Sequence, residues 1–286
     1  MVVLTALSAA LFAAILIPFK ILPIIPGVTE VRPANAVPIV CSILFGPAGA
    51  WGSAFGNFIG DFFFGLGPGS LFGMVGNFFY GFVPYVFWRA MFGNETPRSD
   101  SRRHWAGLIF ICFVSSAACA FTIAWPIRVV LWGVPFAVLG TIIFFNNFLM
   151  SLILSPWLLF ALLPRVRAWG LMYGQLLPET AVVRPRFAWL GVVLLTVGSV
   201  GGMVGGVAIE TGLYDRAIGV PQLIKGIRRA AMPVAREAPV SATVVIEPAP
   251  AAAPKPAGAV ASAERTTLGL GLVPALALVV AGMLLL

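Results

Sequence analysis

The stretch LFGPAGA, Leu44 to Ala50, interrupts a long apolar segment in the first quarter of the chain. The residues on either side, Pro33–Phe45 and Ala48–Gly65, would together be too long for one membrane crossing, which needs about 20 residues. Gly46-Pro47 breaks a helix because proline has no amide hydrogen and glycine readily adopts turn conformations. We therefore predict two spans joined by a tight turn, of which the first is short.

The composition of the whole chain indicates a membrane protein. Of its 286 residues, 60% are hydrophobic and only 10% are charged, and the mean hydropathy is +1.00. A soluble domain has about 25% charged residues. Hydrocarbon requires every backbone polar group to be paired internally, and the long continuous apolar runs favour helices over a barrel.

Apolar segments of span length recur along the whole chain. In order they are Val2–Ile25, Pro33–Phe45, Ala48–Gly65, Leu71–Arg89, Trp105–Trp125, Phe136–Leu163, Phe187–Thr211 and Thr267–Leu286. The first has no positively charged region before it, so we expect a retained span and not a signal peptide. The predicted fold is an all-α polytopic membrane protein: a six-helix bundle with one or two additional C-terminal transmembrane helices.

A change of composition after the sixth span divides the chain. Residues 1–168 form the predicted six-span membrane core, and residues 186–212 form an extra transmembrane helix. Residues 213–266 include EPAPAAAPKPAGAVASAER, an Ala/Pro-rich linker that cannot build a packed core and is expected to be disordered. Residues 267–286 are a hydrophobic segment that we expect to form a further transmembrane helix.

The positive charges segregate between the two ends of the predicted spans. One end receives Arg89, Arg98, Arg102, Arg103, Arg165, Arg167, Arg184 and Arg186, and the other only Lys20, Arg32 and Arg128. The positive-inside rule then places the arginine-rich end and the amino terminus in the cytoplasm of a multi-pass cell-membrane protein. The net charge of +8 is explained by this orientation signal, so no nucleic-acid partner is expected.

Polar residues within the apolar runs gather in the half of the core that is expected to face outward. They are Asn57 and Asp61 in the third span, Asn77 and Tyr80 in the fourth, and Asn146 and Asn147 in the sixth, with Glu30, Arg32 and Asn35 in the preceding outer loop. Polar groups inside a membrane usually face a bundle interior or cavity and mark a substrate path. Their convergence predicts an outward-opening pocket, lined with aromatics, for a small polar molecule.

Simpler interpretations of the same residues stay open. Asp61 could pair with Arg32 or Lys20 near the membrane interface, and any one asparagine could simply join two helices. The joint position of the polar residues favours a binding site more than any single residue does.

The first predicted span carries alanines at helical spacing. Ala6, Ala10 and Ala14 recur every fourth residue and therefore share one face of the helix. Such a flat strip permits close contact with another helix, either inside the bundle or on a partner membrane protein.

The residues argue against an enzyme and against a resident metal or cofactor. Cys41, Cys112 and Cys119 lie in apolar runs without metal-ligand spacing, and the single histidine, His104, lies in a charged loop. Intramembrane hydrolysis would need a Ser/His pair, paired aspartates or a metal cluster, and the core has one intramembrane aspartate.

Taken together, these features resemble the substrate-binding S-component of energy-coupling factor (ECF) transporters, in the branch that includes queuosine-precursor transporters. The similarity is closest across EVRPANAVPIVCSILFGPAGAWGSAFGNFIGDFF (residues 30–63) and GSLFGMVGNFFYGFVPYVFW (residues 69–88), and it covers about residues 1–168. It rests on the combination of six spans, the alanine strip, the Gly-Pro turn and the polar outer half.

The resemblance implies a subunit that captures a vitamin or a vitamin/nucleobase precursor and has no ATPase of its own. It further implies a transmembrane coupling subunit that contacts Ala6, Ala10 and Ala14, two cytoplasmic ATPase subunits, and an outer lid from Lys20 to Asn35. The tail departs from the family, whose members normally end after the sixth span. The alternative is an independent secondary carrier or channel for a small solute; such carriers often show inverted repeats, and we find none in the sequence.

Overall fold

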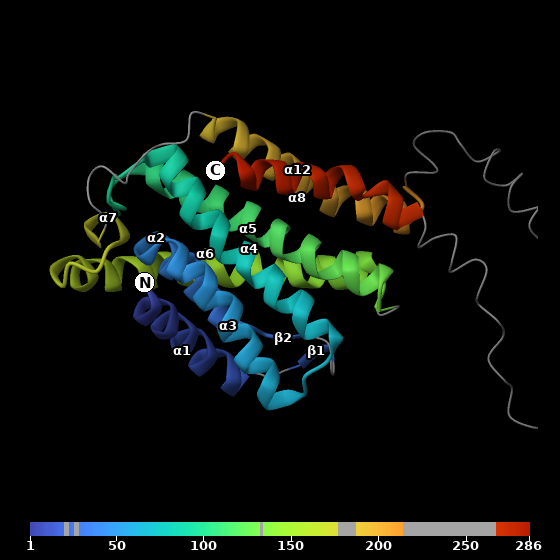
Figure 1. Ribbon diagram of the computed structural model, residues 1–286, viewed down its shortest axis with the longest axis horizontal. Helices are drawn as coiled ribbons and strands as arrows, with labels where there is room; N and C mark the ends of the chain where they lie inside the picture. Colours follow the sequence, from blue (N-terminus) through green and yellow to red (C-terminus); the bar gives the residue numbers. More distant parts are fainter. Residues whose placement is uncertain (20–22, 26–28, 132–133, 177–186, 214–266) are drawn as a thin grey trace, which may run out of the picture.

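The protein is a bundle of long helices whose two termini lie at the same end (Figure 1). The computed structural model describes the chain except for residues 20–22, 26–28, 132–133, 177–186 and 214–266, and the side chains of residues 23–25, 29–30 and 64. The predicted linker (apart from Leu213), Lys20, Arg184, Arg186 and the side chain of Glu30 therefore lie outside the described part.

The elements follow one another as a nearly all-helical chain. They are α1 (Val2–Phe19), β1 (Pro23–Ile25), β2 (Thr29–Glu30), the 3-10 turn η1 (Pro33–Asn35), α2 (Ala36–Phe45), α3 (Pro47–Phe64), α4 (Pro68–Phe92), α5 (Arg102–Val129), α6 (Phe136–Ala168), α7 (Tyr173–Leu176), α8 (Ala188–Glu210) and α12 (Val273–Leu284). The two short strands pair antiparallel, at the end of the bundle opposite the termini.

Six helical segments of the described chain are long and apolar enough to cross a membrane. They are Val2–Phe19, Pro68–Phe92, Arg102–Val129, Phe136–Leu176, Ala188–Glu210 and Thr267–Leu284. Helix α3 packs among them, against α1 on one side and α4 on the other. The predicted all-α polytopic membrane fold is thereby confirmed.

The turn predicted between the second and third segments is confirmed at Gly46. This residue has φ +63° and ψ −135°, and its N–H caps α2 by donating to the Ser42 carbonyl at 3.0 Å. Pro47 occupies the start of α3, where the missing amide hydrogen has no role in the helix. Helix α3 then returns along α2 so closely that a Cβ on Gly49 would lie 2.4 Å from the Ser42 nitrogen.

Two predicted spans are shorter than expected. Helix α2 has ten residues, or about 15 Å, roughly half of a hydrocarbon core of about 30 Å. The first predicted span, Val2–Ile25, ends as a helix at Phe19, and Pro23–Ile25 is a strand instead. Pro23 explains the second difference, because it cannot donate a helical hydrogen bond and disfavours helix in the residue before it. At the start of the other span, Pro33–Asn35 forms the 3-10 turn η1 and not part of α2.

Helices α8 and α12 pack together as an antiparallel pair on the side of the bundle away from α1 (Figure 1). Glycines of α8 make this close packing possible, because a Cβ on Gly202 would lie 2.8 Å from the Phe121 ring of α5, and one on Gly206 would lie 2.3 Å from the Phe136 ring of α6. On its other side, Gly198 lies against the backbone of α12. Helix α8 is therefore packed between the core and α12.

We expect Gly46→Ala to lower the free energy of unfolding by about 1–3 kcal/mol, because it adds both backbone strain and a steric clash. A Cβ at this position would lie 2.6 Å from Cγ of Tyr173, and φ is +63°. Reversible SDS unfolding in mixed micelles measures the change.

Gly201→Ala is the matched control, since Gly201 is helical and a Cβ there would meet nothing within 4 Å. In a Tyr173→Ala background the clash disappears and only the backbone strain of Gly46→Ala should remain. Wild-type stability of Gly46→Ala would contradict the strained turn.

Candidate functional site

One arm of a polar network joins η1 to α3 inside the bundle. Arg32, which precedes η1, donates from Nη1 to Asn57 Oδ1 at 3.0 Å. Asn57 in turn donates from Nδ2 to Asp61 Oδ2 at 3.2 Å, one helical turn away. Asn57 is buried, and Arg32 and Asp61 are half-buried. Asn57 thus links a guanidinium to a carboxylate.

A second arm joins the same segment to α6. The backbone N–H of Arg32 donates to Asn146 Oδ1 at 3.4 Å, and Asn35 Nδ2 donates to Asn147 Oδ1 at 2.7 Å. Asn35, Asn146 and Asn147 are all buried. The Tyr80 hydroxyl of α4 donates to the backbone carbonyl of Asn147 at 3.1 Å. Four parts of the chain, η1, α3, α4 and α6, therefore meet at these side chains.

Local sequence explains how these groups come together. Because α2 starts part-way through the bundle, the irregular backbone before it needs partners that a helix would supply itself. Asn146 accepts the Arg32 N–H of this backbone. The Ser155 hydroxyl of α6 donates to the carbonyl of Ala36, the first residue of α2, at 3.4 Å. On α4, a Cβ on Gly73 would lie 3.0 Å from Asn57 Nδ2, so a larger residue there would press on the asparagine side chain.

Asn77 lies beside this network and is not joined to it by a side-chain hydrogen bond in the described structure. Its Nδ2 donates to the Gly73 carbonyl of its own helix at 2.9 Å, and its side chain is buried. The structure thus brings together all the predicted site residues except two. Asn77 makes its hydrogen bond within its own helix, and the side chain of Glu30 is outside the described part.

Polar side chains of α5 and α6 that the sequence did not predict as site residues also lie close to the network. The buried Cys119 thiol lies near the Asn147 side chain and near Arg32. The Tyr80 hydroxyl lies near Ser116 and Ser151. The sequence carries a signal for the α5 residues, because Cys112, Ser116 and Cys119 recur at intervals of four and three residues and therefore share one face of the helix.

The site offers both hydrogen-bond donors and acceptors in an apolar surrounding. The guanidinium of Arg32 donates only, the carboxylate of Asp61 accepts, and the amides of the asparagines do both. These donors and acceptors can match the polar edge of a small molecule, whose hydrogen bonds would replace those between the side chains of the network. The asparagine amides also hydrogen-bond to protein groups of the site, so the interpretation of the asparagines as helix-joining groups fits the same hydrogen bonds.

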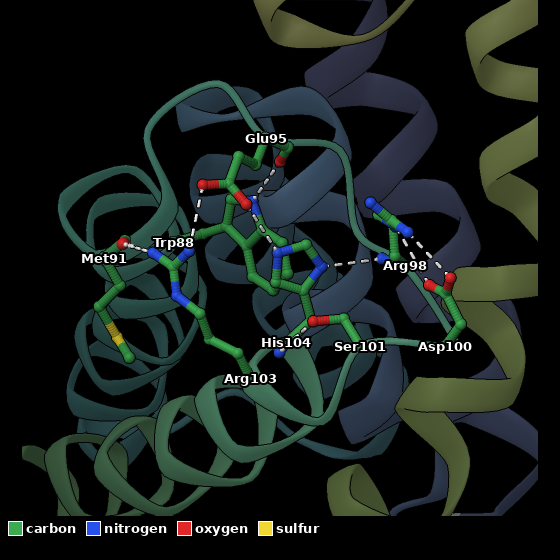
Figure 2. Close-up of polar contacts among 8 residues, drawn as sticks. All are labelled: Trp88, Met91, Glu95, Arg98, Asp100, Ser101, Arg103 and His104. Carbon is green, nitrogen blue, oxygen red and sulfur yellow. Dashed lines mark hydrogen bonds and ion pairs between the residues drawn. The ribbon is translucent and has the colours of Figure 1, made fainter.

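A separate polar cluster organises the loop between α4 and α5 (Figure 2). His104 is buried between the rings of Trp88 and Phe92, at 5.3 and 4.8 Å. Its Nδ1 accepts the Arg98 backbone N–H at 3.1 Å, which leaves Nε2 as the donor to Glu95 Oε2, also at 3.1 Å. The single histidine is therefore a structural residue of this loop.

Glu95 is the centre of that cluster. The hydrogen bond from His104 lowers the pKa of the Glu95 carboxyl, and the nearby Arg103 guanidinium acts in the same direction. Arg103 donates to Glu95 at 3.3 Å and to the Met91 carbonyl at 3.0 Å. These bonds tie the start of α5 to the end of α4 without forming a candidate site.

No group of three or more His, Cys, Asp or Glu residues is placed to hold a metal ion within the described ranges. The three cysteines are free thiols and are buried.

The alanines of α1 lie on two different faces of the helix. Ala9 and Ala13 are buried, next to glycines of α3: a Cβ on Gly56 would lie 2.8 Å from the Ala9 carbonyl oxygen. The three alanines of the predicted partner face, Ala6, Ala10 and Ala14, are exposed on the outer side of α1. Inner packing and an outward-facing strip therefore coexist on this helix.

Comparison with protein families identifies the core. The family model described as QueT transporter matches residues 2–164, more than half of the chain. The chain belongs to the QueT transporter family. No curated protein and no solved structure gave a match. The family resemblance predicted from the sequence is confirmed.

Membership of the QueT transporter family gives this multi-pass membrane protein a transport role for a small substrate. The matched residues contain η1 and the polar side chains of α3, α4 and α6, so the network described above belongs to the family core. Helices α7, α8 and α12 follow the match. These three helices of the QueT-family chain therefore lie outside the matched region.

We expect Asn147→Ala to destabilise the protein by about 1–3 kcal/mol, because it leaves the buried Nδ2 of Asn35 without an acceptor. The Asn35–Asn147 distance is 2.7 Å. Reversible SDS unfolding measures the loss.

Asn77→Ala is the matched control: the same residue type, equally buried, but bonded within its own helix. We expect a smaller loss there, and Asn35→Ala combined with Asn147→Ala should cost less than the sum of the two single changes. Additive losses would show that the two amides do not interact.

Proposed function

We propose that this QueT-family protein is the substrate-capture subunit of an ATP-driven importer of a vitamin or of a vitamin/nucleobase precursor. The polar network carries the proposal: a guanidinium, a carboxylate and several amides converge within a bundle whose core is mainly apolar. Polar groups inside a membrane are costly and usually serve a substrate path. The proposed ligand pocket is lined by Glu30, Arg32, Asn35, Asn57, Asp61, Asn77, Tyr80, Asn146 and Asn147.

The pocket of this proposal opens to the outside of the cell. Both termini and the arginines of the α4–α5 loop lie at one end of the bundle, and Arg165 and Arg167 end α6 there. The positive-inside rule assigns that end, with the amino terminus, to the cytoplasm. The network lies toward the other end of the bundle, because it surrounds the beginning of α2, whereas Gly46 lies at the end of that helix.

The chemistry of the pocket suggests a compact polar cargo. Arg32 suits a carbonyl or an anionic group, Asp61 and Glu30 suit a ring N–H or a cation, and the asparagines suit the edge of a heterocycle. Directional hydrogen bonds of this kind select strongly, because a wrong ligand leaves buried polar groups unpaired.

We expect Arg32→Ala and Asn147→Ala each to reduce the amount of ligand retained by the purified protein about tenfold or more, since each removes a buried hydrogen-bonding partner. Mass spectrometry of the small molecules released from the full chain identifies the ligand and measures its occupancy. Ser115→Ala is the control, because this buried hydroxyl donates only to Ile111 of its own helix in the described structure.

Unchanged occupancy in both site variants would contradict the pocket. A cysteine at the exposed Leu66, in the turn between α3 and α4, tests the sidedness in a background without other cysteines. Labelling of that residue only from the cytoplasm would place the network on the wrong side for capture.

The energy source of the proposed importer is a separate complex, with one transmembrane coupling subunit and two cytoplasmic ATPase subunits. The exposed alanines of α1 support this, because Ala6, Ala10 and Ala14 leave a flat strip on which another helix can lie closely. An independent carrier would need no such partner.

We expect replacement of Ala6, Ala10 and Ala14 by leucine to abolish copurification with the coupling subunit and the ATPases, while ligand occupancy stays normal. The bulkier side chains prevent close helix contact without altering the interior. Val193→Leu on the exposed face of α8 is the control. Full copurification of the triple variant would remove α1 as the docking face, and uptake by the chain alone would favour an independent carrier.

A further inference from the structure

The additional helix α8 is fastened to both α5 and α6 by one carboxylate. Arg128, at the end of α5, donates from Nε to Glu210 Oε1 at 2.7 Å. The second oxygen, Glu210 Oε2, accepts the backbone N–H of Ala137 in the first turn of α6. The side chains of Arg128 and Glu210 are only 14% and 12% exposed.

This arrangement satisfies two electrostatic needs together. The first turn of a helix has N–H groups without helical partners and carries the positive end of the helix dipole. A carboxylate placed there is stabilising, and its charge also compensates the arginine at the end of α5. In a poorly hydrated position such a pair interacts more strongly than on a wet surface, and removing one partner leaves the other charge uncompensated.

Apolar packing by the two turns of α8 that precede Glu210 also joins this helix to α5 and α6. Met203 of α8 lies where α5 and α6 meet, since a Cβ on Gly140 would lie 3.3 Å from Met203 Cε and 3.4 Å from Ala124 Cβ. Gly202 and Gly206 of α8 receive the rings of Phe121 and Phe136. Helix α8 therefore contacts both helices along about two turns.

Helices α5 and α6 carry part of the candidate site. Cys119 and Asn146 each lie about two and a half turns, or about 14 Å, from the Glu210 junction along their helices. The buried Cys119 thiol of α5 lies near the Asn147 side chain of α6. A shift of α5 against α6 would separate these two groups and displace the asparagine amides.

We propose that Glu210 is a positioning residue for the substrate site. Acting through Arg128 and the first turn of α6, it sets the register of α5 against α6 and so places Asn146 and Asn147. This role rests on the proposed function of the network as a binding site. The C-terminal extension then serves the transport core directly.

The native cysteines can report a change in the register of α5 against α6, so no cysteine has to be introduced. We expect Glu210→Ala in the full-length chain to raise the rate at which N-ethylmaleimide alkylates Cys119 about tenfold, because the α5–α6 contact opens more often. Cys41, buried in α2 and distant from α8 in the chain, should keep its wild-type rate. Peptide mass spectrometry follows each cysteine in the same sample.

Further variants separate positioning from general stability. Arg128→Ala should act like Glu210→Ala, and the double variant should react no faster than the faster single variant, since the two residues form one unit. Glu210→Asp keeps the charge on a shorter side chain and should react at an intermediate rate. Thr211→Ala is the control, because its hydroxyl is exposed and donates only to Val207 of its own helix in the described structure.

Equal acceleration of Cys41 and Cys119 would overturn the proposal by showing general loosening, and an unchanged Cys119 rate would overturn it by showing that α8 is a passive attachment. A second measurement compares the retained ligand in wild type and Glu210→Ala, where we expect about a tenfold loss. Lack of ligand in the wild type would refute the proposed capture function, while the cysteine rates would still decide whether Glu210 sets the helix register.

Discussion

The reversal of the chain at Gly46 is the constraint on which the rest of the bundle depends. A positive φ of +63° lets α2 end and α3 return along it without an intervening loop. Because α2 has only ten residues, its beginning lies inside the bundle, level with Asn57 on α3. Irregular backbone at that depth is tolerated only where protein groups pair with it. Asn146 of α6 accepts the N–H of Arg32 in this segment, so the short helix and the polar network have one origin.

The same network that completes the backbone also supplies the proposed binding chemistry. Each of its amides is buried, and several have their hydrogen bonds met by a neighbouring helix rather than by their own. A ligand that enters must replace these bonds with equally good ones, which makes selection by polar complementarity strict. Asn77, bonded to Gly73 of its own helix, is the exception and depends least on what the site contains.

The helices beyond the matched family region are part of the same physical unit. Glycines bring α8 into contact with Phe121 and Phe136, and Glu210 pairs with Arg128 at the end of α5. An ion pair with little exposure contributes strongly only when both partners are held, so it favours one register of the helices it joins. The face of α5 and α6 that α8 covers is closed to other proteins, whereas the outer alanines of α1 stay exposed.

The sequence by itself determined the membrane class, the helical fold, the turn at Gly46 and the types of residue in the candidate site. It could do so because hydrocarbon imposes long apolar helices, and because glycine followed by proline acts locally. Only the tertiary structure decided that Pro33–Asn35 forms a 3-10 turn before α2, that Asn35 joins Asn147 while Asn77 bonds its own helix, and that Glu210 meets Arg128. These outcomes depend on which faces of helices distant in the chain come into contact, and neither hydropathy nor residue spacing within one helix specifies that.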